Sequence, residues 1–237
     1  MKAFLLFSLL MIAFYGFAQQ SNTEINTHYI KHMKDPSDKI TQGFGPLTQN
    51  SRELTTKIKT VHVTHGIRYQ ITNSSAGDFV TIVAEENIMP FVQMIEDGDY
   101  MSFALSGSIE SDEGILIIMN NKNLSDLLVK DGAEGEVLLT ECENVSITVM
   151  GGSDMKLKGS TEELDLFVKG GSNLDGRKFH VAKGNVAVKG ASETTIAISE
   201  SLKAHSENGS VLIYFGNPEA TTITEKLDGK VFHRESD

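Results

Sequence analysis

Two closely spaced histidines are the first residues of this sequence whose types could do chemistry. His62 and His65 lie three residues apart in a segment of alternating apolar and polar residues. Strand side chains alternate between two faces, so these imidazoles are expected on opposite faces, where they cannot share a metal ion without a bulge. His28 and His32 would align on a helix, but no glutamate follows His28 to complete a His-Glu-x-x-His zinc site. We therefore predict no metal site from the histidines.

The acidic turns of the sequence are candidate calcium-binding sites. Asp97-Gly98-Asp99 and Ser111-Asp112-Glu113-Gly114 carry the oxygen ligands that calcium prefers. Gly151-Gly152-Ser153-Asp154 is also similar to the glycine-rich nonapeptide calcium repeat. That repeat has an aspartate every time, whereas the positions matching Asp154 hold Asn173 and Glu193. Solvated turns explain these segments better, so we predict no cofactor and leave calcium at the acidic turns as the alternative.

Nucleophiles and carboxylate pairs give no catalytic pattern. No Gly-x-Ser-x-Gly sequence occurs, and Cys142 is flanked by Glu141 and Glu143, whose negative charges would raise the pKa of its thiol. Polysaccharide-cleaving sites need carboxylates, or a basic residue with calcium, gathered on one strip. The residues expected to face outward show no such strip and include Lys156, Lys158, Asp165, Lys169, Lys189 and Thr195. We predict no catalytic residue.

The composition excludes some classes of partner. Acidic residues outnumber basic ones by 32 to 21, and the resulting net charge of −11 repels nucleic-acid phosphates and anionic lipid surfaces. Cys142 is the only cysteine, so no internal disulfide can form and the fold must be held by its packing. We expect no nucleic-acid partner.

Residues 1–18 have the features of a cleavable signal peptide. Lys2 precedes an apolar run, and Gly16-Phe17-Ala18 offers small residues at a cleavage site. Residues 19–37 are polar and are expected to form a tail, and residues 38–237 a single domain. No other segment approaches the roughly 20 apolar residues that span a membrane. We expect export by this signal peptide to the periplasm, the cell surface or the medium, with no transmembrane segment after cleavage.

Glycines recur at a nearly constant interval in the second half of the chain. They are separated by 19, 19, 20, 19 and 20 residues and stand at Gly132, Gly151, Gly170, Gly190, Gly209 and Gly229. Such a period predicts a repeat architecture. Six residues past successive glycines, an expected apolar column holds Leu138, Leu157, Gly176, Ile196 and Phe215. A second expected column, two residues before the glycines, holds Val149, Val168 and Val188 and is interrupted by Lys130 and Glu207.

This period predicts an all-β fold, a parallel β-helix with one coil per 19–20 residues. Alternating residues predict strands in Val61–Val63, Ile67–Ile71, Val80–Ile82, Met155–Lys158 and Val186–Val188. If the period held from Lys39 to the end of the chain, about ten coils would stack at the usual spacing of strands. A β-sandwich is the alternative, but a sandwich does not require glycines in step.

The chain resembles the auto-transporter adhesins with a head GIN domain, a family of exported proteins of Gram-negative bacteria. The resemblance covers roughly residues 39–232. It rests on the order of Gly43-Phe44-Gly45, the segment 61–67, the Gly-Gly-Ser and Gly-Ala-Ser repeats, and the ending Tyr214-Phe215-Gly216-Asn217-Pro218. The resemblance implies a right-handed β-helix exported to the periplasm or cell surface, and no established activity.

These observations predict a non-enzymatic, adhesin-like scaffold that presents a β-helical surface to a protein or glycan of the cell envelope. The alternative is a carbohydrate-binding or polysaccharide-processing β-helix protein. A third hypothesis is a homo-oligomer that forms through open strand edges, because the first and last coils of a stack must be capped or paired. Lys230 to Arg234 is expected to be such a cap.

Overall fold

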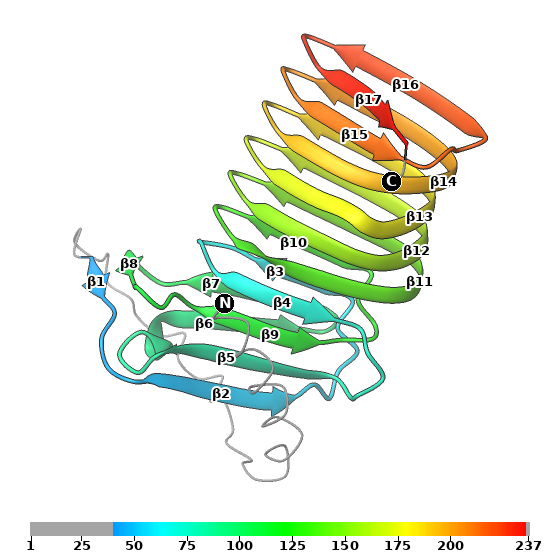
Figure 1. Ribbon diagram of the computed structural model, residues 1–237. Coiled ribbons are helices and arrows are strands. Elements are labelled where there is room, and N and C mark those ends of the chain that lie inside the picture. The colour runs from blue at the N-terminus through cyan, green and yellow to red at the C-terminus, as the bar shows by residue number, and fades with distance from the viewer. Residues whose placement is uncertain (1–39, 236–237) are drawn as a thin grey trace. The chain divides into compact units, whose positions relative to one another are not determined.

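The computed structural model describes residues 40–235, which are all-β apart from one 3-10 turn, Met89–Phe91 (Figure 1). The expected signal peptide (residues 1–18), the expected tail (residues 19–37), His28 and His32 lie outside the described residues. The described part of the chain belongs to one compact unit. No helix in it is long and apolar enough to cross a membrane.

Residues 40–235 contain seventeen strands. The first nine are β1 (Thr41–Gln42), β2 (Leu47–Glu53), β3 (Thr60–Val63), β4 (Arg68–Thr72), β5 (Phe79–Glu85), β6 (Val92–Asp97), β7 (Tyr100–Leu105), β8 (Ile109–Glu110) and β9 (Leu116–Asn120). The remaining eight are β10 (Asp126–Lys130), β11 (Glu134–Met150), β12 (Asp154–Lys169), β13 (Asn173–Lys189), β14 (Glu193–Glu207), β15 (Val211–Phe215), β16 (Ala220–Lys226) and β17 (Lys230–Arg234). All five strands predicted from alternation are present.

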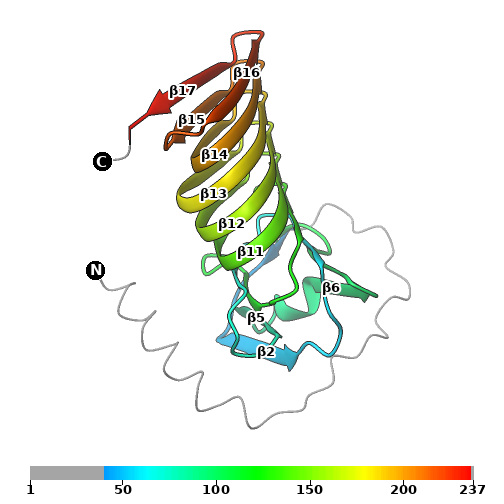
Figure 2. The same cartoon turned by 90° about the vertical axis from the view of Figure 1, so that its right-hand side faces the viewer.

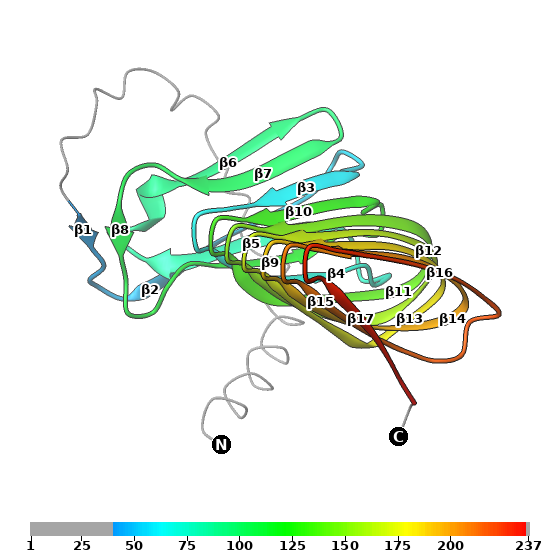
Figure 3. The ribbon, with the colours of Figure 1, turned by 90° about the horizontal axis from the view of Figure 1, so that it is seen from above.

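The long strands β11 to β14 each bend once and contribute to two faces of a flattened coil (Figure 2). Face 1 consists of β3, β10, the C-terminal halves of β11 to β14, and β16. Face 2 consists of β4, the N-terminal halves of β11 to β14, β15 and β17. Neighbours within each face are parallel, and successive coils overlie one another (Figure 3). The predicted parallel β-solenoid is confirmed, with about five turns.

Each corner from face 1 to face 2 is a turn of two residues with left-handed backbone. The φ angles are 68° and 74° at Gly151-Gly152, and 59° and 79° at Asp131-Gly132. Five more corners have the same pair of positive φ angles, at His65-Gly66, Gly170-Gly171, Gly190-Ala191, Asn208-Gly209 and Leu227-Asp228. Glycine adopts this backbone without steric cost and Asn or Asp with little, which explains the glycine period.

The paired corner residues correct the register expected from the glycines. Gly151, Gly170 and Gly190 occupy the first corner position, whereas Gly132 and Gly209 occupy the second. At Gly132 and Gly209, the interior residue therefore lies five residues past the glycine, not six as expected. Leu138 pairs with Lys158 and points outward, 41% exposed, and Phe215 pairs with Ala197. The interior positions are filled instead by the buried side chains of Val137 and Tyr214.

The same correction applies to the second expected column. Val129 and Ser206 occupy it in place of Lys130 and Glu207, so these two residues do not interrupt it. Its members stack in the order Val63, Val129, Val149, Val168, Val188, Ser206 and Glu225. A neighbouring column on face 1 runs Val61, Leu127, Ile147, Leu166, Val186, Ala204 and Ile223. The first five residues of each column are buried, so the core is a stack of near-equivalent apolar layers.

Buried serines line the corner inside the stack. The backbone N–H of Ser153 donates to Oγ of Ser172 at 3.1 Å, and the N–H of Ser172 donates to Oγ of Ser192 at 3.1 Å. Ser210 Oγ donates to the Val188 carbonyl at 2.7 Å. This ladder satisfies backbone groups that the turn would otherwise leave buried without a partner, which accounts for serine in the Gly-Gly-Ser repeats.

The period does not hold in the front part of the unit, so the extension to about ten coils fails. Residues 73–120 are inserted between β4 and β10. Within this insertion, β5 pairs antiparallel with β9, and β6 pairs antiparallel with β7. Strand β5 also pairs antiparallel with β2, which precedes the insertion. An ion pair joins Arg52 of β2 to Glu96 of β6, and Thr56 donates a hydrogen bond to the same carboxylate. These contacts tie together the outermost strands at this end of the stack.

At the other end, one inward-facing column of each face finishes on a polar side chain. Glu225 follows Ser206 in its column and accepts a hydrogen bond from the Val231 N–H at 2.6 Å. His233 follows Tyr214, and the two rings stack with centroids 4.8 Å apart. Ile223, which ends an apolar column, is 45% exposed because no further coil covers it. Strand β17 is therefore the last strand of face 2, where His233 covers the ring of Tyr214.

Candidate binding groove on face 1

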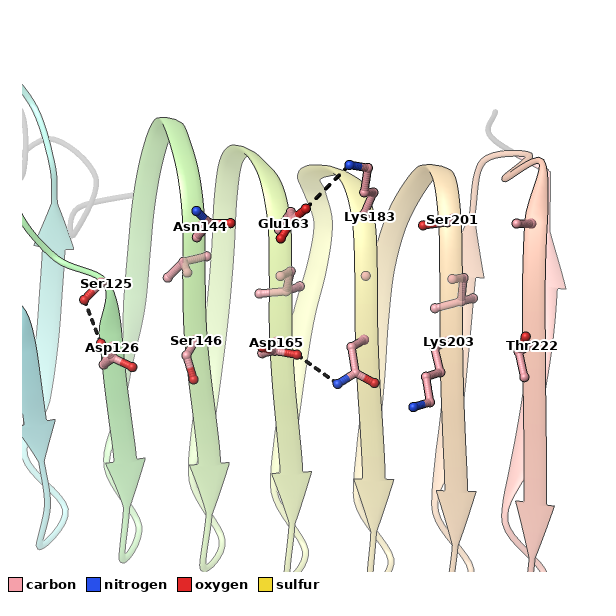
Figure 4. A pocket seen from close by; sticks show the side chains of 16 residues that line it. Ser125, Asp126, Asn144, Ser146, Glu163, Asp165, Lys183, Ser201, Lys203 and Thr222 are labelled. Atoms are coloured by element: carbon pink, nitrogen blue, oxygen red, sulfur yellow. Dashed lines mark hydrogen bonds and ion pairs between the residues drawn. The ribbon is translucent and has the colours of Figure 1, made fainter.

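A shallow groove of about 590 Å³ crosses face 1 from β10 to β16 (Figure 4). Two rows of outward side chains line it, one residue per coil. The first row is Asn144, Glu163, Lys183, Ser201 and Ala220. The second row is Asp126, Ser146, Asp165, Asn185, Lys203 and Thr222. Because equivalent positions of stacked coils lie above one another, residues far apart in sequence form a continuous polar surface.

Alternation along each strand produces the floor of the groove. Between the two rows lie Val145, Leu164, Gly184 and Leu202, which point toward the core and are buried. Their edges line the groove along with the polar rows. The floor of the groove is therefore the strand backbone between the two rows, with these buried side chains beneath it.

The polar walls are ordered by contacts between neighbouring coils. Asn185 Nδ2 donates to Oδ1 of Asp165 at 2.8 Å, and Lys183 Nζ lies 3.5 Å from Oε1 of Glu163 (Figure 4). Within one coil, Ser125 Oγ also donates to the Asp126 carboxylate at 2.6 Å. Three carboxylates (Asp126, Glu163, Asp165) stand against two ammonium groups (Lys183, Lys203), so the groove is nearly balanced in charge.

A second hollow of about 290 Å³ adjoins the groove and shares Asp126 and Ser146 with it. It is lined by His62, whose ring meets Tyr100 edge-on with centroids 4.8 Å apart. Tyr100 Oη and His62 Nδ1 form a hydrogen bond of 3.0 Å. Burial, and then the charge of Lys130, lower the pKa of His62 below its ordinary value, so this imidazole is neutral at pH 7.

His62 and His65 are not brought together. His62 projects outward from β3, whereas His65 is the first residue of a left-handed corner and bonds through Nδ1 to Thr64 Oγ1. Within residues 40–235, no three His, Cys, Asp or Glu side chains gather closely enough to hold a metal ion.

Backbone groups and Ser111 tie the acidic turns to neighbouring segments. Asp99 closes the β6–β7 hairpin, where its carbonyl accepts hydrogen bonds from the N–H groups of Lys59 and Thr60 at 2.7 and 3.0 Å. In the other turn, Ser111 Oγ bonds to the buried carboxylate of Glu85, and Arg68 donates to the Glu113 carbonyl. The repeat positions Asp154, Asn173 and Glu193 form a row on face 2, with Asn173 Nδ2 2.8 Å from Asp154 Oδ1.

Cys142 lies at the bend of β11 and is half-buried. Asn73 Nδ2 lies 3.2 Å from its Sγ. Burial raises the pKa of the Cys142 thiol, which agrees with the expected direction but has a different cause, since the flanking Glu141 and Glu143 are exposed. The thiol is therefore protonated at neutral pH and is a poor nucleophile.

Sequence reasoning missed the groove, although a signal for it exists. Asn144, Glu163, Lys183 and Ser201 are spaced by 19, 20 and 18 residues, as are Ser146, Asp165, Asn185 and Lys203. The carboxylates of the groove, Glu163 and Asp165 on β12 and Asp126 on β10, stand in two separate rows. Aligning the coils by both residues of each corner, rather than by glycine alone, reveals these rows.

A stack of parallel coils with a polar groove along one face defines a solenoid scaffold with a candidate binding surface. The chain belongs to the family described as "putative auto-transporter adhesin, head GIN domain", whose model matches residues 57–218. This match confirms the resemblance noted in the sequence. No curated protein matches the chain.

Solved structures share the fold at low sequence identity. A putative adhesin from Bacteroides fragilis is 16% identical with a TM-score of 0.66, and the match covers 82% of this chain and 100% of that one. A putative adhesin from Parabacteroides merdae is also 16% identical, with a TM-score of 0.50 and coverage of 84% and 99%.

Proposed function

We propose that this protein is an exported, adhesin-like scaffold that attaches to a partner through face 1 and performs no catalysis. The groove on face 1 carries the proposal, because it presents two ordered rows of polar side chains along most of the stack. The family description and the names of the two similar structures support attachment as the role.

The rigidity of the groove suits this role. The groove strands are held by parallel ladders on both sides, and side chains such as Asn185 and Lys183 are already ordered by contacts with the next coil. A pre-organised surface loses little conformational entropy when it binds, which favours attachment through many modest contacts.

Attachment is tested with beads coated with residues 19–237 and placed on envelope fractions and on extracellular-matrix proteins. Ser146→Trp fills the point where the groove meets the second hollow, whereas Lys156→Trp places the same side chain on face 2. The proposal predicts that wild-type and Lys156→Trp beads attach and that Ser146→Trp beads do not. Equal attachment by all three, or by none, contradicts it.

We also propose export to the cell surface. The features of residues 1–18 and the family support it. Protease added to intact cells should degrade the protein, and mass spectrometry of the intact protein should find Gln19 at its N-terminus. Full protection in intact cells, with degradation only after the outer membrane is opened, would place the protein in the periplasm instead.

Polysaccharide processing is the second candidate, because Asp126, Glu163 and Asp165 all line the groove. Carboxylates on one strip can act as general acid and base on a glycosidic bond. The test is release of reducing ends from polysaccharides, with Glu163→Gln as the variant. Release that Glu163→Gln abolishes would replace the scaffold proposal, and absence of release favours attachment.

A further inference from the structure

We infer that the groove on face 1 binds a neutral, extended polysaccharide chain that lies across the strands, along the stacking axis. This inference rests on the proposed function and names its ligand class. Two properties of the groove carry it: the spacing of its polar rows and the balance of donors and acceptors.

The spacing fits a linear chain of sugars. The two polar rows repeat once per coil, and coils in a parallel stack lie about 4.8 Å apart. This interval is similar to the length of one sugar residue in an extended, β-linked polysaccharide. A chain lying along the axis would therefore meet an equivalent pair of side chains at each sugar, from Asp126 at one end to Thr222 at the other.

The chemistry of the walls fits hydroxyl groups. Lys183 and Asn185 donate hydrogen bonds, Glu163 and Asp165 accept them, and Ser146 does both. Sugar hydroxyls also donate and accept, so each can use partners of either kind. The near balance of charge favours a neutral ligand, and the three carboxylates oppose a phosphate-bearing one.

A peptide strand is a poorer fit. Peptides usually bind sheets by adding a strand to an open edge, where backbone groups are free. The backbone of β11 to β14 is already paired on both sides along the groove, so side chains alone are offered. The neutral ring of His62 lies in the adjoining hollow.

Matched variants of equivalent geometry exist on the two faces. Asn185 bonds to Asp165 on face 1 at 2.8 Å, and Asn173 bonds to Asp154 on face 2 at the same distance. Lys203 and Lys156 are both exposed and point outward from their strands. Asn185→Ala with Lys203→Ala is the groove variant, and Asn173→Ala with Lys156→Ala is its control.

Calorimetry with residues 19–237 would use cellohexaose, xylohexaose and mannohexaose as neutral probes and polygalacturonate as the anionic one. At least one neutral hexasaccharide should bind, and the groove variant should weaken binding by about tenfold or more, because two side-chain hydrogen bonds are lost. The control variant should bind like the wild type. Thermal melts of both variants check that they fold.

Three results would overturn the inference: no binding of any neutral probe at millimolar concentration, tighter binding of polygalacturonate, or equal weakening by both variants. If the beads still attach through face 1 while no glycan binds, the ligand inference fails and the scaffold proposal stands. If glycans bind but Ser146→Trp leaves attachment unchanged, the attachment proposal fails instead.

Discussion

Gly135 is the neighbour of Tyr69 in the stack, and a Cβ on this glycine would lie 2.1 Å from the Tyr69 carbonyl oxygen and 2.7 Å from its ring. The Tyr69 side chain is buried, and its hydroxyl donates to the Asp154 carbonyl at 3.2 Å. The glycine thus makes room for a tyrosine that links strands β4, β11 and β12. The same burial raises the pKa of Tyr69 far above its ordinary value, so it stays a donor at all physiological pH values.

Gly135→Ala should therefore lower the free energy of unfolding by about 2 kcal/mol or more, because the backbone of Tyr69 cannot move aside without disturbing its ladder. Tyr69→Phe removes only the hydroxyl and should cost about 1 kcal/mol. Urea denaturation measures both. A Gly135→Ala protein as stable as the wild type would show that the two strands are not packed as described.

Ala191 occupies a left-handed corner position, with φ of 57°, where the equivalent residues are Gly152 and Gly171. Ala191→Gly should stabilise the protein by about 0.5–1 kcal/mol, because relief of backbone strain exceeds the added entropy of the unfolded chain. Ala197→Gly, in extended strand β14, should destabilise it by a similar amount. Thermal denaturation of the pair tests the corner geometry, and the same sign for both would contradict it.

Ile147 and Ile223 belong to one column, but the first is fully buried and the second, in the last coil, is 45% exposed. Ile147→Ala should cost about 2–5 kcal/mol, the usual range for a buried isoleucine. Ile223→Ala should cost less than about 1 kcal/mol, because its side chain is already partly hydrated. Equal losses in urea denaturation would mean that another layer covers Ile223 in solution, as an end-to-end oligomer would.

Asp175 on face 2 should make stability depend on pH. Hydrogen bonds from the Arg177 side chain, at 2.9 and 2.7 Å, lower the pKa of Asp175 to about 2. A carboxyl whose pKa is depressed by folding contributes stability above its unfolded pKa, near 3.9, and loses it as the pH falls through the folded value. The urea midpoint of Asp175→Asn should therefore lie below that of the wild type at pH 6, and the difference should vanish between about pH 4 and pH 2. A difference that persists at pH 2 would point to a cause other than the charge.

The stack of coils was predictable from sequence because corner geometry restricts residue choice. Two successive residues with positive φ select Gly, Asn or Asp, and the period of these residues is visible in a single sequence. The register within a coil was less accessible, since Gly132 and Gly209 occupy a different corner position from Gly151. One residue of error moves a side chain from the core to the surface, which is what happened to Leu138.

The front part and the groove were harder to predict for a different reason. Residues 73–120 alternate as strands do, but alternation does not distinguish antiparallel from parallel pairing, so the pairing of β5 with β2 could not be anticipated. The groove depends on contacts between coils, such as that of Asn185 with Asp165, and becomes visible only when the register is known.

Hydrogen–deuterium exchange tests most directly whether face 1 is the binding face. It is measured on residues 19–237 with and without the envelope fraction to which the coated beads attach. Protection should concentrate in residues 144–150, 163–169, 183–189 and 201–207, the face 1 halves of β11 to β14. Their face 2 halves should exchange as in the free protein. Protection centred on face 2, or confined to β16 and β17 at the end of the stack, would contradict the account.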